Sequence, residues 1–146
     1  MTELIVNQSI EIEASSSKVW DVLTKAELTE RWVKNFGIDG KIVSDWQLGS
    51  LVQWQGNDGF VYVEGNVTAL DPGKMVRFTV FDTRSERPPI SEEDGITYRL
   101  SDIDGHMLLT IRQGDFGKMP DGEKYYLATV EIWAKVLPQL KALAET

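Results

Sequence analysis

The side chains best suited to chemistry are few in this sequence. His106 is its only histidine and follows Asp104 and Gly105 in a predicted turn, so a serine–histidine triad would place its base on a turn tip rather than in a cleft. The stretch from Asp102 to Gly105 is only a fragment of a calcium-binding loop, because it lacks the third acidic position and the distant Glu. The chain also has no cysteines and no glycine-rich phosphate loop. We therefore predict no catalytic residue, no metal site and no cofactor, and the sequence favours a binding protein over an enzyme.

Large aromatic side chains form the second candidate set. Small-molecule sites are mostly apolar with a few placed polar groups, but bulky aromatics also fill ordinary cores, so a ligand pocket and a packed core both stay open. Gln113 is the polar residue of interest, because strand alternation puts it on the same face as Leu109 and Ile111. An unpaired buried amide costs about 1–3 kcal/mol, so we expect Gln113 to bond to a ligand, to water or to backbone near Gly114. The predicted ligand-binding residues are Trp32, Phe36, Trp54, Phe78, Tyr98, Ile111, Gln113, Phe116, Tyr126, Val130 and Trp133.

The first third of the chain predicts one strand and two short helices. Apolar and charged residues alternate over Ile10–Glu13, as in a half-buried strand. Ser15 is a good N-cap for a helix that ends near Leu23. A second helix is expected over about Ala26 to Val33. Of the two helical tryptophans, Trp20 is expected in the core and Trp32 at the rim of a groove.

Five more strands and a long helix follow. The strands are expected over Ser50–Gln55, Phe60–Leu70, Met75–Phe81, Ile96–Ile103 and Met107–Gln113, where apolar and polar residues alternate between turns. From about Glu123 to Glu145 an apolar stripe at helical spacing begins at Leu127 and ends at Ala144. These elements predict an α+β fold in one domain, residues 1–146, with a curved six-stranded antiparallel sheet wrapped round the C-terminal helix.

Charge and hydropathy limit the partners. The 146 residues carry a net charge of −8, which argues against nucleic acid, because that partner requires concentrated Lys and Arg. No uncharged apolar run approaches the roughly 20 residues of a membrane span, and the first residues lack the pattern of an export signal. We expect a cytoplasmic protein. The acidic segment Asp82–Gly95 is expected to be a solvated loop or a lid over a ligand.

Several stretches, in order along nearly the whole chain, resemble one family. They are IEIEASSSKVWDVLTKAELTERW from Ile10, SDWQLGSLVQWQG from Ser44, GNVTALDPGKMVRFTV from Gly65, TIRQGDF from Thr110 and IWAKVLPQLKALAE from Ile132. The pattern is similar to the START/Bet v 1-like (SRPBCC) superfamily, in particular the group named after the activator of the heat-shock protein 90 ATPase. The resemblance implies a helix-grip fold, with two short helices between the first and second strands.

The resemblance leaves the activity open, because this fold hosts many functions. The favoured prediction is binding of a hydrophobic or amphipathic small molecule, lipid-like or polyketide-like, between the sheet and the C-terminal helix. The first alternative, implied by the group's name, is a chaperone-interaction module. The second is a cyclase- or dehydratase-like enzyme that uses the same pocket, which a buried and strongly perturbed acid or base would support. Both a monomer and a homodimer are compatible with the sequence.

Overall fold

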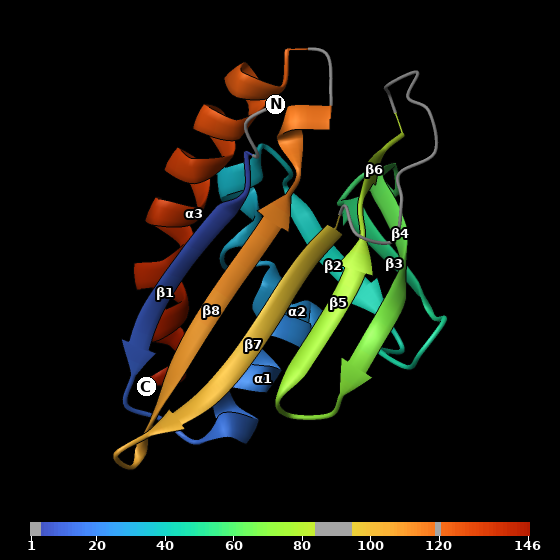
Figure 1. Ribbon diagram of the computed structural model, residues 1–146. Coiled ribbons are helices and arrows are strands. Elements are labelled where there is room, and N and C mark those ends of the chain that lie inside the picture. Colours follow the sequence, from blue (N-terminus) through green and yellow to red (C-terminus); the bar gives the residue numbers. More distant parts are fainter. Residues whose placement is uncertain (1–3, 84–94, 119–120) are drawn as a thin grey trace.

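The computed structural model describes residues 4–83, 95–118 and 121–146. The chain forms an antiparallel sheet, with short helices after its first strand and one long helix at its C-terminal end (Figure 1). Most of the acidic Asp82–Gly95 segment lies outside the described residues, so its role as a lid stays a prediction. The elements are β1 (Val6–Ile12), α1 (Ser16–Thr24), α2 (Ala26–Thr29), the 3-10 helix η1 (Val33–Phe36), β2 (Gly40–Ser44), β3 (Leu51–Gly56), β4 (Val61–Asp71), β5 (Met75–Thr79), β6 (Phe81–Asp82), β7 (Gly95–Ile103), β8 (His106–Gly114), the 3-10 helix η2 (Phe116–Lys118) and α3 (Gly122–Ala144).

The α+β prediction is confirmed, but the strand count is corrected. The sheet runs β1-β8-β7-β5-β4-β3-β2 with antiparallel neighbours, and the two-residue β6 pairs with β4. The prediction of six strands missed β2 and β6. In the five-residue β2 only Gly40 and Ile42 are buried, so its alternation is too short to stand out from a loop. Thr29 instead fixes β2 in place, because its hydroxyl accepts a hydrogen bond of 2.9 Å from the backbone N–H of Ile42.

Local signals correctly predict the start of α1. The Ser15 hydroxyl accepts a hydrogen bond of 3.2 Å from the backbone N–H of Lys18, as an N-cap should. The second helix is shorter than expected: α2 ends at Thr29, and η1 follows it.

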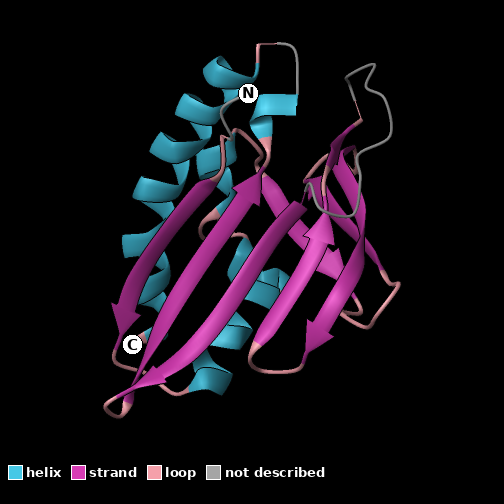
Figure 2. Cartoon of the chain, viewed as in Figure 1, coloured by secondary structure: helices cyan, strands magenta, loops and turns pink. Residues whose placement is uncertain are grey.

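One face of the sheet is covered by helices. Figure 2 shows α3 and the short helices on the same side of the curved sheet, and α3 packs mainly on β1 and α1. We call this side the covered face and the other side the open face. The buried residues of α3 are Gly122, Trp133, Val136, Leu137, Leu140 and Ala144. Leu127, expected in this stripe, is 55% exposed, so the stripe begins later than predicted. No helix in the described ranges is long and apolar enough to span a membrane.

The two helical tryptophans are reversed relative to the prediction. Trp32 is fully buried, whereas Trp20 only packs against the edge of the core. The indole N–H of Trp32 donates to the backbone carbonyl of Val22 at 3.0 Å. This bond joins the end of α1 to the segment after α2, so Trp32 is a core residue rather than a rim residue.

Candidate functional site

Six aromatic side chains from five segments meet on the covered face. Phe36 of η1 lies 5.1 Å from Trp54 of β3 and 5.0 Å from Trp133 of α3, between ring centroids. Trp133 also lies 6.1 Å from Trp32 and 6.3 Å from Tyr98, and Tyr98 lies 5.5 Å from Phe78. These separations are typical of edge-to-face and tilted aromatic pairs. We call these residues the aromatic cluster: Trp32, Phe36, Trp54, Phe78, Tyr98 and Trp133.

Two polar atoms within the aromatic cluster lack a hydrogen-bond partner among the described residues. They are the indole nitrogen of Trp54 and the hydroxyl oxygen of Tyr98, and both are buried. Other indoles of the core are paired: Trp46 donates to the carbonyl of Thr24 at 2.9 Å, and Trp133 donates to Oε1 of Gln113 at 2.9 Å. A buried polar group without a partner costs about 1–3 kcal/mol. The Trp54 and Tyr98 groups therefore need an explanation, and a hydrogen bond to a bound ligand would provide one.

Burial has a strong electrostatic effect on Tyr98. Its hydroxyl is removed from water, and this desolvation raises the pKa of the side chain well above its ordinary value of about 10. Tyr98 is therefore neutral at physiological pH and offers its O–H as a hydrogen-bond donor, with two lone pairs as acceptors. Such a group can orient a ligand but is poorly suited to transfer a proton near pH 7.

Gln113 lies where strand alternation predicted. It is at the end of β8, in register with Val6 of β1 and Ile96 of β7, and its side chain reaches α3 through the Trp133 bond. The sequence alone favoured a local bond near Gly114. The bond to Trp133 instead crosses from the sheet to the long helix, so Gln113 fixes the orientation of an indole in the aromatic cluster.

The remaining predicted site residues lie beside the cluster. Ile111 is fully buried on β8, opposite Tyr98. Phe116 and Tyr126 form a separate pair with centroids 6.4 Å apart, between η2 and the first turns of α3. Val130, on the next turn, is half-buried and accepts a hydrogen bond of 3.0 Å from the Gln8 side chain on its carbonyl. The predicted set thus divides into the aromatic cluster with Ile111 and Gln113, and a second group at η2 and the N-terminal half of α3.

Two structural residues escaped the sequence analysis. Trp46 is buried, has a positive φ of 53° and makes an edge-to-face contact with Phe78, with centroids 5.5 Å apart. Thr29 is fully buried and donates to the carbonyl of Ala26 while it accepts from β2. The Asp-Trp pair before a glycine was a visible signal for Trp46. Nothing in the local pattern marks Thr29, since its role depends on a strand that the pattern missed.

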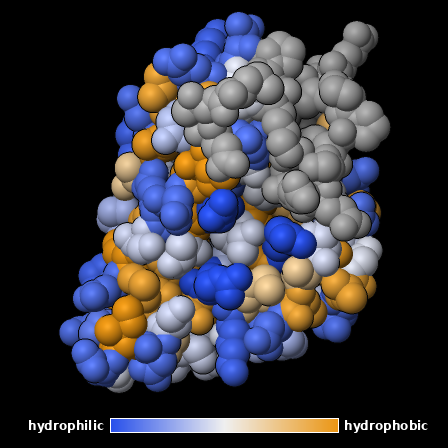
Figure 3. Space-filling view, viewed as in Figure 1, coloured by the Kyte–Doolittle hydropathy of each residue, from blue (hydrophilic) through white to orange (hydrophobic). Residues whose placement is uncertain are grey.

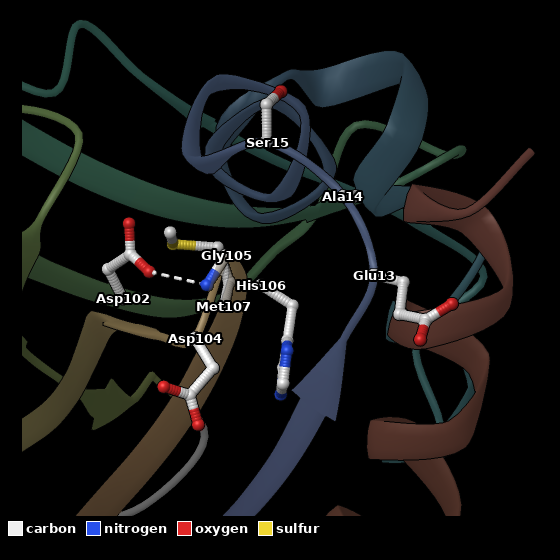
Figure 4. Close-up of a pocket in the computed structure, with 8 residues that line it drawn as sticks. All are labelled: Glu13, Ala14, Ser15, Asp102, Asp104, Gly105, His106 and Met107. Atoms are coloured by element: carbon white, nitrogen blue, oxygen red, sulfur yellow. Dashed lines mark hydrogen bonds between the residues drawn. The ribbon is translucent and has the colours of Figure 1, made fainter.

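A solvent-open depression of about 650 Å³ lies elsewhere, between the β1–α1 connection and the β7–β8 hairpin. Figure 4 shows that the carboxylates of Glu13 and Asp104 point away from each other, while Asp102 accepts a bond from the Gly105 N–H. His106 Nε2 lies 3.3 Å from Glu11 Oε2 without the alignment of a hydrogen bond. In the described part of the chain, no three His, Cys, Asp or Glu residues are grouped to hold a metal ion. The depression therefore offers no convergent set of ligands.

Known structures share the whole fold. The Aha1 dimer from Colwellia psychrerythraea is 22% identical, with a TM-score of 0.71, and the match covers 99% of this chain and 97% of that one. Protein MLL2253 from Mesorhizobium loti is 21% identical with a TM-score of 0.75, and 95% of each chain is covered. CalU16 from Micromonospora echinospora is 17% identical with a TM-score of 0.66, covering 97% of this chain and 74% of that one. At these identities the likeness shows the fold alone.

Sequence comparison gives the family. A search of curated proteins found no match. The profile described as "Activator of Hsp90 ATPase homolog 1-like protein" matches residues 13–145, which is nearly the whole chain and includes every helix that contributes to the aromatic cluster. The chain therefore belongs to the Activator of Hsp90 ATPase homolog 1-like family, with an SRPBCC-type fold.

Proposed function

We propose that this protein binds a hydrophobic or amphipathic small molecule, lipid-like or polyketide-like, between the covered face of the sheet and α3. The observation that carries the proposal is the pair of buried polar groups in the aromatic cluster, Trp54 Nε1 and Tyr98 OH, for which the described residues provide no hydrogen-bond partner. Small-molecule sites combine an apolar lining with a few such groups. A ligand that carries oxygen acceptors on a flat apolar skeleton would satisfy both donors and stack against the rings.

The ligand would reach the cluster past Phe36. Its ring is the half-buried member of the cluster and contacts both Trp54 and Trp133. Tyr126 and Val130, on the neighbouring turns of α3, are half-buried as well. Movement of the Phe36 ring would therefore open the route to the two indoles, and burial of ligand surface would contribute about 25 cal/mol per Å².

Relatives support a small-molecule ligand. DynU16, which has the same fold at a TM-score of 0.73 and 15% identity, comes from the dynemicin biosynthetic locus; the match covers 48% of that chain. A biosynthetic locus makes small molecules, so this neighbour supports the proposal that the fold binds one. We also propose a cytoplasmic location, which suits a chain without cysteines.

The experiment is native mass spectrometry of protein purified from its own host, followed by organic extraction and identification of any released compound. We expect a stoichiometric small molecule, retained by the Tyr125→Phe control, which removes an exposed hydroxyl, and reduced in Tyr98→Phe. A bare protein mass, together with no binding of 8-anilinonaphthalene-1-sulfonate, would show that the aromatic cluster is only packed core.

A second candidate is a chaperone-interaction module, which the family description and the solved Aha1 relative favour. Tyr98 also bears on the enzymatic alternative, because it is a buried, strongly perturbed acid. Its pKa is raised, however, which suits donation of a hydrogen bond better than proton transfer. Co-purification of Hsp90 with a ligand-free protein would favour the chaperone candidate over the ligand-binding one.

A further inference from the structure

Three arginines lie together on the open face of the sheet. Arg77 of β5 and Arg112 of β8 are both in register with Thr97 of β7, one on each side of it. Arg99 is two residues further along β7, so its side chain points to the same face. Arg99 and Arg112 are exposed and Arg77 is half-buried. We call Arg77, Arg99 and Arg112 the arginine face.

Sheet geometry fixes the spacing of these residues. Neighbouring strands lie about 4.8 Å apart and alternate residues about 6.7 Å apart. The Cα atoms of Arg77 and Arg112 are therefore about 10 Å apart, and that of Arg99 is about 8 Å from each. Figure 3 shows strongly hydrophilic groups in the middle of this face, over the strands β5, β7 and β8.

The three guanidinium groups have no acidic partner in the part of the chain that the structure describes. The ion pairs found there involve other residues, and the one hydrogen bond found for the three side chains runs from Arg77 Nε to Thr68 Oγ1 at 3.2 Å. On this face Arg112 lies between Thr97 and Asn7 of the neighbouring strands, and Arg99 lies between Thr110 and Met75. A protein with a net charge of −8 thus has a local positive surface whose guanidinium groups are not paired with a carboxylate of the described residues.

We propose that the arginine face binds an acidic segment of a partner protein in an extended conformation. Arginine forms paired hydrogen bonds with carboxylates. Carboxylates at alternate positions of an extended chain are about 6.7 Å apart, a separation that long arginine side chains can match from Cα atoms about 8 Å apart. A short segment responds mainly to charges within the Debye length of about 8 Å. An anionic membrane or a nucleic acid would instead meet the repulsion of the whole acidic protein.

The test uses a capped ten-residue peptide of alternating Glu and Thr, with its Gln-Thr counterpart as the uncharged control. Addition of the Glu peptide to 15N-labelled protein should shift the amide signals of Thr97, Arg99 and Thr110, and should do so less at high salt. Changing Arg99 and Arg112 together to Gln should weaken binding roughly tenfold, as measured by fluorescence anisotropy.

The matched control is the double variant Arg31→Gln, Lys34→Gln, which removes two exposed positive charges away from the sheet. It should change the affinity less than twofold. If both double variants bound the peptide equally weakly, the loss of affinity would come from the change in net charge alone, and the proposal would be overturned. Binding of phosphatidylserine vesicles or self-association through this face, without peptide binding, would also overturn it. Because both arginines are exposed, the variant should fold, which its amide spectrum checks.

Discussion

Replacing Tyr98 by Phe distinguishes the effect of the buried hydroxyl on the stability of the protein from its effect on ligand binding. In the structure the hydroxyl is fully buried and unpaired among the described residues, and an unsatisfied buried polar group costs about 1–3 kcal/mol. Removal of one oxygen leaves a small cavity that offsets part of the gain. We expect Tyr98→Phe to stabilise the ligand-free protein by about 1 kcal/mol, which raises Tm by about 4 °C for a domain of this size.

Ligand binding should change in the opposite direction. The variant loses a donor, and a hydrogen bond of about 0.5–1.5 kcal/mol corresponds to a Kd that is weaker by roughly two- to thirteenfold. Thermal and urea unfolding measure the first effect, and titration with the compound identified by extraction measures the second. Tyr125→Phe, on the exposed surface of α3, should change neither quantity. If Tyr98→Phe destabilised the ligand-free protein by 1 kcal/mol or more, the hydroxyl would have a stabilising partner and the reasoning would fail.

High pH supplies an independent check on Tyr98. Burial raises its folded-state pKa above the ordinary value near 10, so the unfolded chain releases this proton at a lower pH than the folded chain does. The stability associated with the neutral hydroxyl is fully present below about pH 10 and is lost as the pH rises above it. Between pH 10 and 11 the wild type should lose about 1 kcal/mol relative to Tyr98→Phe, as measured by urea unfolding. Parallel curves for the two proteins would contradict the raised pKa.

Three further predictions concern the framework around the site. Gln113→Leu leaves the buried indole N–H of Trp133 without its acceptor, so it should cost about 1–3 kcal/mol in urea unfolding; no loss would mean that the bond is dispensable. Thr29→Val removes the acceptor of a buried β2 amide and should speed hydrogen exchange in that strand, whereas Thr29→Ser should preserve it. Glu145 has its pKa lowered mainly by the Lys141 hydrogen bond, so its contribution to stability is present above about pH 4.3 and falls as the carboxylate is protonated. Glu145→Gln should therefore reduce the fall in the free energy of unfolding at acid pH, as measured by urea unfolding.

The sequence predicts local structure well where neighbouring residues determine it. Ser15 caps α1 because its partner is three residues away, and the polar–apolar alternation of β7 and β8 gives their buried faces correctly. The strand β2 was missed because distant contacts hold it in the sheet. Periodicity likewise gives the face on which Trp20 and Trp32 lie but not the depth of each, which depends on how α3 packs above them.

The site was predictable only in composition. Sequence identified the aromatic residues that gather under α3, because large apolar side chains on covered faces must meet there. It could not show which polar atoms of the aromatic cluster would be paired. Trp133 has a partner because β8 brings Gln113 beneath it, whereas Trp54 and Tyr98 have none among the described residues, and this difference depends on strands far apart in the chain. Ligand contact by the predicted residues remains a prediction.

The most direct test of an interior ligand site follows the indole N–H signals in the 15N spectrum during titration with 8-anilinonaphthalene-1-sulfonate, whose sulfonate oxygens are acceptors. The indole N–H of Trp54 has no hydrogen-bond partner among the described residues, while that of Trp46 is bonded to a backbone carbonyl. The account predicts that the Trp54 signal shifts strongly and saturates, and that the Trp46 signal stays in place. A titration that shifts only the half-buried Trp20, or that leaves Trp54 unchanged while the dye binds, would contradict a ligand site within the aromatic cluster.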